Sequence, residues 1–151
     1  MDARQLMRYK RHLLLPQIDI AGQQLLLDAS VLVIGTGGLG SPVLMYLAGA
    51  GIGKLLLYDD DTVEISNLQR QVLFDSNVMG QSKAKIAAQR LRALNADCEV
   101  IAVASRLEGE LLREAVAKVD LVIDCSDNFS TRFAVNMACV EKHKTLAVSY
   151  T

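Results

Sequence analysis

Residues 31–61 decide the fold, and they read VLVIGTGGLGSPVLMYLAGAGIGKLLLYDDD. This stretch starts with Val31 to Ile34, a short apolar run rich in β-branched residues, which is typical of a strand buried on both faces. A glycine turn (35–40), an apolar helical segment to about Ala50 and a second apolar strand (54–58) follow, before three aspartates. This order predicts a β-turn-α-β unit. We therefore expect an α/β, Rossmann-like, doubly wound and mainly parallel sheet with helices on both faces.

The glycine turn has the pattern G-x-G-x-x-G, which is suited to binding phosphate. Glycine permits positive φ and lets backbone N–H groups come close to phosphate oxygens. The following helix directs its positive N-terminal end at the same anion. Asp59 lies 19 residues after Gly40 (59 − 40), where such units place the acid that binds ribose hydroxyls. A nucleotide site is predicted, with a purely structural turn as the alternative; its residues would be Gly35, Gly37, Gly38, Gly40 and Asp59.

Composition excludes several classes of protein. The 151 residues carry a formal charge of −1, with Lys and Arg spread along the chain, which argues against nucleic-acid or membrane-surface binding. The longest apolar run near the start, residues 13–15, is too short for a signal peptide or membrane span, so we expect a cytoplasmic protein. Three widely spaced cysteines, Cys98, Cys125 and Cys139, indicate neither a disulfide framework nor a C-x-x-C metal site. Cys125 has no histidine close in sequence to activate it, which favours a buried residue over a nucleophile.

The N-terminal part, residues 1–28, is expected to be a helical segment outside a nucleotide-binding α/β domain that comprises residues 29–151. A cationic cluster at residues 8–11 surrounds Tyr9. One interpretation is a solvated helix face, and the other is a functional set of cations; the residues alone favour neither. In the solvated-face interpretation, the helix docks on the rest of the protein with three leucines facing inward: Leu6, Leu13 and Leu14.

Two cations after the three aspartates suggest a ligand with more charge than a dinucleotide. Arg70 lies in residues 62–74, which fit neither a helical nor a strand period. Ser82 is a good N-cap for a helix over 83–94, which puts Lys83 in the first turn, where the helix dipole disfavours a cation. An anion near this helix end would resolve that conflict, so we predict that Lys83 contacts phosphate. The alternative for Arg70 is an exposed loop arginine without a ligand, and the alternative for Lys83 is a tolerated surface lysine.

Polar residues also follow the apolar strand expected at residues 119–125. Ligands in open α/β sheets gather beyond the carboxyl ends of strands, so Asp127 and Asn128 are expected to face the same crevice as the glycine turn. We expect Ser130 to cap a helix that begins near Thr131, which leaves Asp127 free to bind Mg²⁺. The alternative is that Asp127 itself caps that helix.

The last element expected is a strand over residues 144–149, two residues before Thr151. Nothing after it would cover the sheet edge that it creates. We therefore expect this domain to be truncated at its C-terminal end, with the natural protein extending beyond Thr151, or another copy or partner to cover the edge.

Five motifs together resemble the ThiF/MoeB/HesA family, bacterial relatives of the ubiquitin-activating enzymes. The match covers nearly the whole chain, and SNLQRQ with its upstream acids is far more specific than the glycine motif. The motifs, in family order and spacing, are RYKRH (8–12), GTGGLG (35–40), DDDTVEISNLQRQ (59–71), GQSKAK (80–85) and DCSDN (124–128).

The resemblance implies a role for each matching residue. Gly38 would lie against the phosphates of ATP, Asp59 would bind the ribose and Asp127 would bind Mg²⁺. Arg11 would reach the γ-phosphate from the other subunit of a homodimer. The residues that would hold the triphosphate are Asn67, Arg70 and Lys83. Catalytic roles are thereby implied for Arg11, Arg70, Lys83 and Asp127.

The implied reaction is adenylation of the C-terminal glycine carboxylate of a ubiquitin-like sulfur-carrier protein ending in Gly-Gly, with release of pyrophosphate. A carboxylate is already a nucleophile at pH 7, so fixed cations and a metal suffice without a general base. Longer family members bind structural Zn²⁺ through two C-x-x-C pairs, and this sequence contains no such ligands. Residues 105–120 resemble the thiamine branch more than the molybdopterin branch. An NAD-dependent oxidoreductase and a non-catalytic module that binds a ubiquitin-like partner remain as alternatives.

Overall fold

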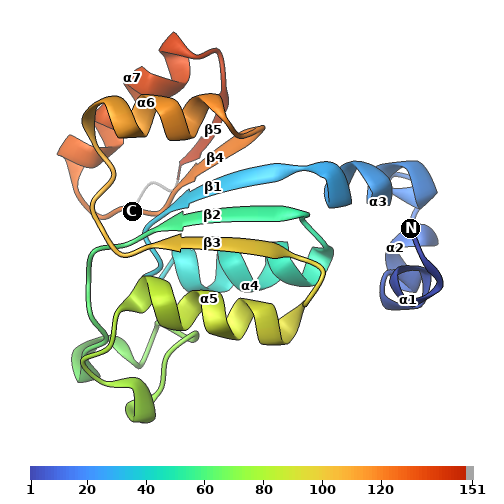
Figure 1. Ribbon diagram of the computed structural model, residues 1–151, viewed down its shortest axis with the longest axis horizontal. Helices are drawn as coiled ribbons and strands as arrows, with labels where there is room; N and C mark the ends of the chain where they lie inside the picture. Colours follow the sequence, from blue (N-terminus) through green and yellow to red (C-terminus); the bar gives the residue numbers. More distant parts are fainter. Residues whose placement is uncertain (149–151) are drawn as a thin grey trace.

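A single parallel sheet organises the chain, whose computed structural model describes residues 1–148 (Figure 1). The strand order is β3-β2-β1-β4-β5, and all four pairings are parallel. The chain thus winds outward from β1 in one direction and then returns to add β4 beside β1, which confirms the doubly wound fold. The expected strand residue Ser149 lies outside the described residues. The strands are β1 (Ser30–Ile34), β2 (Lys54–Tyr58), β3 (Glu99–Val103), β4 (Leu121–Asp124) and β5 (Thr145–Val148).

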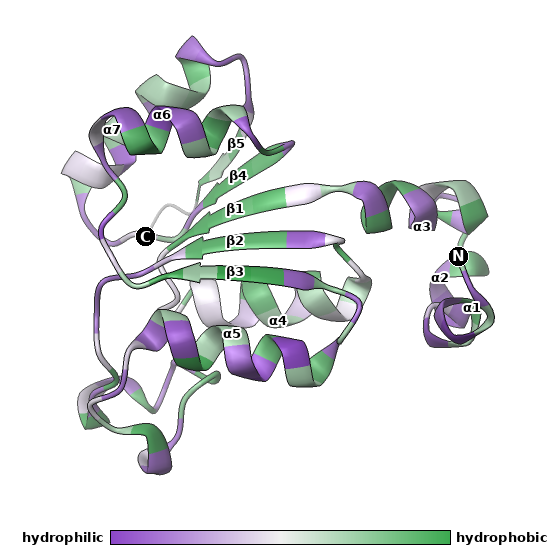
Figure 2. Cartoon of the chain, viewed as in Figure 1, coloured by the Kyte–Doolittle hydropathy of each residue, from purple (hydrophilic) through white to green (hydrophobic). Residues whose placement is uncertain are grey.

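Helices cover both faces of the sheet because its central strand is apolar on both sides. Val31 and Val33 of β1 belong to one buried core, whereas Leu32 and Ile34 point to the other, as the period of two in a strand requires. Figure 2 shows hydrophobic residues along the strands, between the two helical layers. No helix within residues 1–148 is both long and apolar enough to cross a membrane. One face carries α4 (Gly40–Ala50) and α5 (Lys83–Leu94), and the other carries α6 (Gly109–Ala117) and α7 (Phe129–Glu141).

The start of α7 differs from the sequence-based expectation. The helix begins at Phe129, and the cap is Asn128 rather than Ser130. Oδ1 of Asn128 accepts hydrogen bonds from the backbone N–H of Thr131, at 2.9 Å, and from the Ser130 hydroxyl, at 2.8 Å. Asparagine in an extended conformation caps a helix as well as serine does, and Asn128 lies two residues before the position that the spacing favoured. Asp127 is therefore not the cap.

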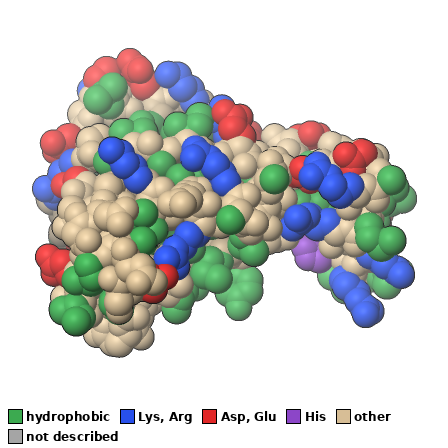
Figure 3. All heavy atoms as spheres, turned by 60° about the horizontal axis from the view of Figure 1, so that its bottom comes forward, with side chains coloured by type: hydrophobic (Ala, Val, Ile, Leu, Met, Phe, Trp, Pro, Cys, Tyr) green, Lys and Arg blue, Asp and Glu red, His purple; other side chains and the backbone are tan. Residues whose placement is uncertain are grey.

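The N-terminal segment projects from the amino ends of the strands (Figure 1). Figure 3 shows several Lys and Arg side chains gathered on this projecting part. The solvated-face interpretation placed Leu6 and Leu14 inward, and this packing is wrong, because these side chains are 41% and 67% exposed. Tyr9 is buried instead, and its hydroxyl accepts a hydrogen bond of 2.8 Å from the Asn95 amide. The segment consists of α1 (Ala3–Arg8), α2 (Lys10–Leu13) and α3 (Asp19–Asp28).

Two buried amides fasten this segment to the end of α4. Asn95 Nδ2 also donates to the carbonyl of Ala48, at 2.8 Å. Gln23 Nε2 donates to the carbonyl of Ala50, at 3.0 Å, while its Oε1 lies 2.7 Å from Nδ1 of His12. The last carbonyls of a helix have no partner within the helix, so these amides satisfy groups that would otherwise need water. The N-terminal segment is thus fixed to the C-terminal end of α4.

The packing of Tyr9 against the turn after α4 can be tested with two glycines. We expect Gly51→Ala to lower the free energy of unfolding by about 1–3 kcal/mol. Gly51 has φ +89°, and an added Cβ would lie 2.5 Å from Cζ of Tyr9. Gly49→Ala is the matched control, because an added Cβ there meets no atom within 4 Å. It should raise stability by about 0.5–1 kcal/mol through helix propensity. Urea denaturation measures both, and equal effects would contradict this packing.

Candidate functional site

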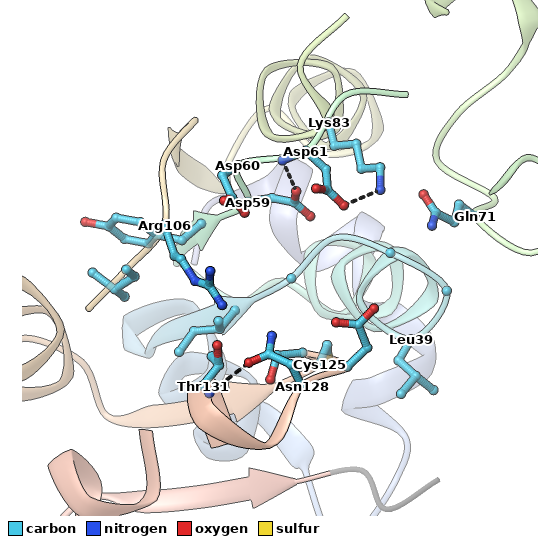
Figure 4. Close-up of a pocket in the computed structure, with 18 of the residues that line it drawn as sticks. Leu39, Asp59, Asp60, Asp61, Gln71, Lys83, Arg106, Cys125, Asn128 and Thr131 are labelled. Atoms are coloured by element: carbon cyan, nitrogen blue, oxygen red, sulfur yellow. Dashed lines mark hydrogen bonds and ion pairs between the residues drawn. The ribbon is translucent and has the colours of Figure 1, made fainter. Parts of the chain in front are cut away.

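A cavity of about 650 Å³ opens at the carboxyl ends of the strands (Figure 4). It lies beyond the ends of the neighbouring strands β1 and β4, where the chain order of the sheet reverses, which is the usual ligand position in an open α/β sheet. Its walls come from the glycine turn, the acids after β2, the loop after β3 and the start of α7. Eight of the predicted nucleotide-binding residues line it: Gly35, Gly37, Gly38, Asp59, Arg70, Lys83, Asp127 and Asn128.

Three predicted site residues do not line this cavity. Gly40 packs beneath the turn, where an added Cβ would lie 2.0 Å from the carbonyl oxygen of Gly35. Asn67 ends the short 3-10 helix η1 (Ile65–Asn67), and its amide lies 3.5 Å from the Ser66 hydroxyl. Arg11 belongs to α2, at the opposite end of the sheet (Figure 1). Gly40 is therefore a packing residue, and the cavity of the same chain lies far from Arg11.

Asp59 holds the glycine turn in its conformation. Its Oδ2 accepts hydrogen bonds from both the backbone N–H and the hydroxyl of Thr36, each at 2.7 Å. Its Oδ1 accepts from the N–H of Asp61, at 2.9 Å. A carboxylate has about four acceptor positions, so one remains for a ligand hydroxyl. Sequence reasoning missed the fully buried Thr36, because the glycine motif leaves that position unspecified.

Lys83 is buried against an acid of the same chain. Its Nζ lies 2.9 Å from Oδ2 of Asp61, and the lysine side chain is only 5% exposed. The backbone joins the same two residues, since the N–H of Lys83 donates to the carbonyl of Asp61 at 3.0 Å. The carboxylate of Asp61 therefore supplies part of the negative charge that offsets Lys83 in the first turn of α5. Lys83 nevertheless lines the cavity, where a ligand phosphate would share it.

A short segment after η1 covers the glycine turn with polar side chains. Arg70 is exposed, and its Nη1 donates to the carbonyl of Ser66 at 3.3 Å. Its side chain lies over Gly38, where an added Cβ would be 3.3 Å from Cδ of the arginine. Gln71 is buried beside the cavity, and its Oε1 has no hydrogen-bond partner among residues 1–148 (Figure 4). This oxygen is positioned to accept a hydrogen bond from a ligand or from water.

Sequence reasoning missed three further lining residues on the opposite wall. Arg132, in the first turn of α7, donates from Nε and Nη2 to the carbonyl of Ser126, at 3.2 and 2.9 Å. Arg106 comes from the loop after β3, and Thr131 from α7. An isolated arginine in a polar loop has no periodicity or motif that could identify it.

The cavity thiol is held in its protonated form. Burial raises the pKa of Cys125 to about 11, and the negative charge of Asp124 acts in the same direction. The thiolate is the nucleophilic form of cysteine, so this environment opposes nucleophilic chemistry at Cys125. All three cysteines are free thiols in this structure.

We expect Cys125 in the folded protein to react slowly with iodoacetamide at pH 8. A pKa of about 11 instead of 9.0 lowers the thiolate fraction roughly 100-fold, and the greater nucleophilicity of a more basic thiolate partly offsets this loss. Alkylation should therefore be about tenfold slower than in the urea-unfolded chain, as peptide mass spectrometry can measure. Cys98, whose pKa burial also raises to about 11, should be slowed in the same way. Faster alkylation of Cys125 in the folded chain would contradict this environment.

Comparison with known proteins identifies the family. The model of the ThiF family matches residues 9–151. The chain belongs to the ThiF family. The sulfur carrier protein ThiS adenylyltransferase of Escherichia coli K12 is 52% identical over 140 residues, which are 93% of this chain and 56% of that protein. A probable molybdopterin-synthase adenylyltransferase of Porphyra purpurea is 44% identical over 137 residues, or 91% of this chain and 36% of that protein. The chain thus spans about half the length, or less, of these ThiF-family relatives.

Solved structures of similar proteins share the same fold. The structure of E. coli tRNA N6-threonylcarbamoyladenosine dehydratase, TcdA, in complex with ATP superposes with a TM-score of 0.90 at 27% identity. The match covers 97% of this chain and 60% of that one. The family resemblance and the Rossmann-like fold expected from the sequence are both confirmed.

Proposed function

We propose that this ThiF-family chain binds Mg·ATP and adenylates the C-terminal glycine carboxylate of a ubiquitin-like sulfur-carrier protein, releasing pyrophosphate. The observation that carries the proposal is the charge distribution in the cavity. Arg70 and Lys83 lie beside the glycine turn, and the carboxylate of Asp127 also lines the cavity. This is the set that a metal triphosphate requires, whereas a dinucleotide reductase has no use for these cations. The adenylyltransferase names of the relatives and the ATP complex of TcdA support it.

The triphosphate would lie over the glycine turn, where Arg70 and Lys83 would contact its oxygens. A ribose hydroxyl would donate a hydrogen bond to the remaining acceptor position of Asp59. Asn67 would have to turn toward the ligand, because it does not line the cavity. Asn128 would contribute only its amide N–H₂ group, since its oxygen caps α7.

The residues present fit a magnesium ion. Asp127 is exposed, and its carboxylate has no hydrogen bond or ion pair within residues 1–148. Asp59, Asp60 and Asp61 also bring oxygens within 4.8 Å of one another, but Asp59 is bound to Thr36 and Asp61 to Lys83. Asp127 is therefore the residue that would hold Mg²⁺ against the phosphates. The ion would supply positive charge for the leaving pyrophosphate.

The reaction needs no proton transfer by this chain. A carrier carboxylate oxygen would attack the α-phosphorus, a new O–P bond would form, and the bond to the β-phosphate oxygen would break. Arg70 and Lys83 would stabilise the charge that develops on the transferring and leaving phosphates. The high pKa of Cys125 agrees with a step that uses no thiolate.

Of the two carrier types, we favour the thiamine type, for which the higher identity to the ThiS adenylyltransferase is support. The decisive experiment is pyrophosphate exchange into ATP with ThiS-type and molybdopterin-type carriers, using carriers without the terminal glycine as controls. Exchange that depends on the terminal glycine is expected. Tighter binding of NAD than of Mg·ATP in calorimetry would overturn the adenylation reaction. The cytoplasmic location expected from the sequence stays a prediction.

The two phosphate-end residues should be essential for exchange. We expect Arg70→Ala and Asp127→Ala each to lower the exchange rate by about 10²- to 10³-fold, the usual effect of removing one charge-stabilising contact. Thermal stability should change little, because both side chains are exposed. Arg113→Ala is a matched control, since this exposed arginine pairs with Glu110 on α6, outside the cavity lining. A folded Arg70 or Asp127 variant with near-normal exchange would remove that residue from the proposed site.

We further propose that the segment comprising residues 1–28 contacts a second copy of the chain and places Arg11 in the cavity of that second copy. Arg11 lies at the opposite end of the sheet from its own cavity, so a role at the phosphates requires another subunit. A two-fold dimer makes such an exchange reciprocal. Exposed apolar side chains near it, Met7 and Leu14, give this segment a surface to bury.

Mixing two inactive variants tests whether Arg11 acts across a dimer. Arg11→Ala and Lys83→Ala should each be inactive alone. After random exchange of subunits, about half the dimers are mixed, and each of these has one intact site. Exchange activity should therefore recover to about one quarter of wild type. If Arg11 served its own subunit, every site would retain a defect, and mixing would restore nothing. Analytical ultracentrifugation measures whether dimers are present.

A further inference from the structure

The loop after β3 carries a cation that the proposed reaction does not use. Figure 4 shows Arg106 extending from this loop into the cavity. Three other cations line the cavity, and each is bound to the protein: Lys83 to Asp61, Arg70 to the Ser66 carbonyl and Arg132 to the Ser126 carbonyl. Within residues 1–148, the guanidinium of Arg106 has no hydrogen bond and no ion pair.

The neighbour of Arg106 fixes where the loop lies. Leu107 is 4% exposed and belongs to the core formed with α6 and β4. Burial of Leu107 anchors the loop, and Arg106 emerges at the rim of the cavity beside it. Tyr58 and Leu107 also line the cavity and supply apolar surface near this arginine.

The strand order places Arg106 at one end of a line. The glycine turn follows β1, Asp59 follows β2, and Arg106 follows β3, and these three strands are consecutive in the sheet. Neighbouring strands are about 4.8 Å apart, so the line from the β1 end to the β3 end spans about 10 Å. A nucleotide has the same order of parts: phosphates, ribose and base. With phosphates on the turn and ribose at Asp59, the base falls at the end of β3.

We infer that Arg106 stacks its guanidinium on the purine base of bound ATP, opposite the apolar surface of Tyr58 and Leu107. The inference rests on the proposed ATP site. A guanidinium is planar and weakly hydrated, and it is attracted to the face of an aromatic ring. Arg106 breaks no existing bond when it does so. A phosphate contact is disfavoured, because two other cations lie nearer the glycine turn: Lys83 (Figure 4), and Arg70, whose side chain lies over Gly38.

Binding of three ligands separates a base contact from a phosphate contact. The ligands are ATP, adenosine and inorganic tripolyphosphate, with affinities from calorimetry or from competition against labelled ATP. Arg106→Ala should weaken ATP and adenosine by the same factor, about 3- to 30-fold, which is the range of such stacking. Tripolyphosphate should bind the variant within twofold of wild type. Arg70→Ala should give the reverse pattern, weakening ATP and tripolyphosphate but not adenosine.

Two further substitutions identify the contact as stacking. Arg106→Trp should restore adenosine affinity, because an indole ring stacks without a charge, whereas Arg106→Gln should not. Arg113→Ala is the control for removal of an exposed arginine, and thermal melting verifies that every variant is folded. Equal loss of ATP and tripolyphosphate, or no loss for any ligand, would overturn the inference. A wild-type chain that does not bind ATP would refute the proposed function itself, whereas ATP binding that ignores Arg106 refutes only this contact.

Discussion

The hydrogen bonds from Thr36 to Asp59 are the constraint on which the site depends. They tie the turn after β1 to the end of β2, so the two strands and the turn form one rigid unit. The turn also has no room to relax, since Gly40 lies directly on the carbonyl of Gly35. The conformation of the turn is therefore fixed before any ligand arrives, and little ordering of this segment would remain when an anion binds.

One acid thus serves both the fold and the site. The bonds to Thr36 and Asp61 use most of the acceptor capacity of Asp59 before any ligand arrives. A mutation of Asp59 would disturb the turn as well as a ribose contact, so its effect on activity could not be assigned to binding alone. Arg70, Asp127 and Arg106 are better probes, because they are exposed and, within residues 1–148, form no hydrogen bond with the turn.

The sequence predicted most of the fold because β1, β2 and β4 are short, nearly continuous apolar runs whose side chains are buried or half-buried between the two helical layers. Prediction from the sequence failed where two nearby residues satisfy the same local rule equally well. Asn128 and Ser130 are both good caps, and only the position of the chain after β4 selects Asn128. The leucines of the N-terminal segment looked like its buried face, but Tyr9 offers an apolar ring together with a hydroxyl that the Asn95 amide can reach.

The site was predictable where residues belong to contiguous motifs. Gly38, Lys83 and Asp127 fall in such motifs, and all three line the cavity. Arg106 and Gln71 were not found from sequence reasoning, because their significance comes from where the chain places them. The carboxyl ends of β1, β2 and β3 bring together loops that are far apart in sequence, and no pattern in one loop reports on the others.

The position of α4 has a consequence for symmetry. Its first turn follows the glycine turn, and its last carbonyls accept hydrogen bonds from the amides that fasten the N-terminal segment. Its 11 residues span about 16 Å. The length of α4 therefore sets the distance between the glycine turn, where an anion would bind, and the N-terminal segment, which carries Arg11. In a two-fold assembly that uses both places, a deletion within α4 would shift them relative to each other in both subunits at once.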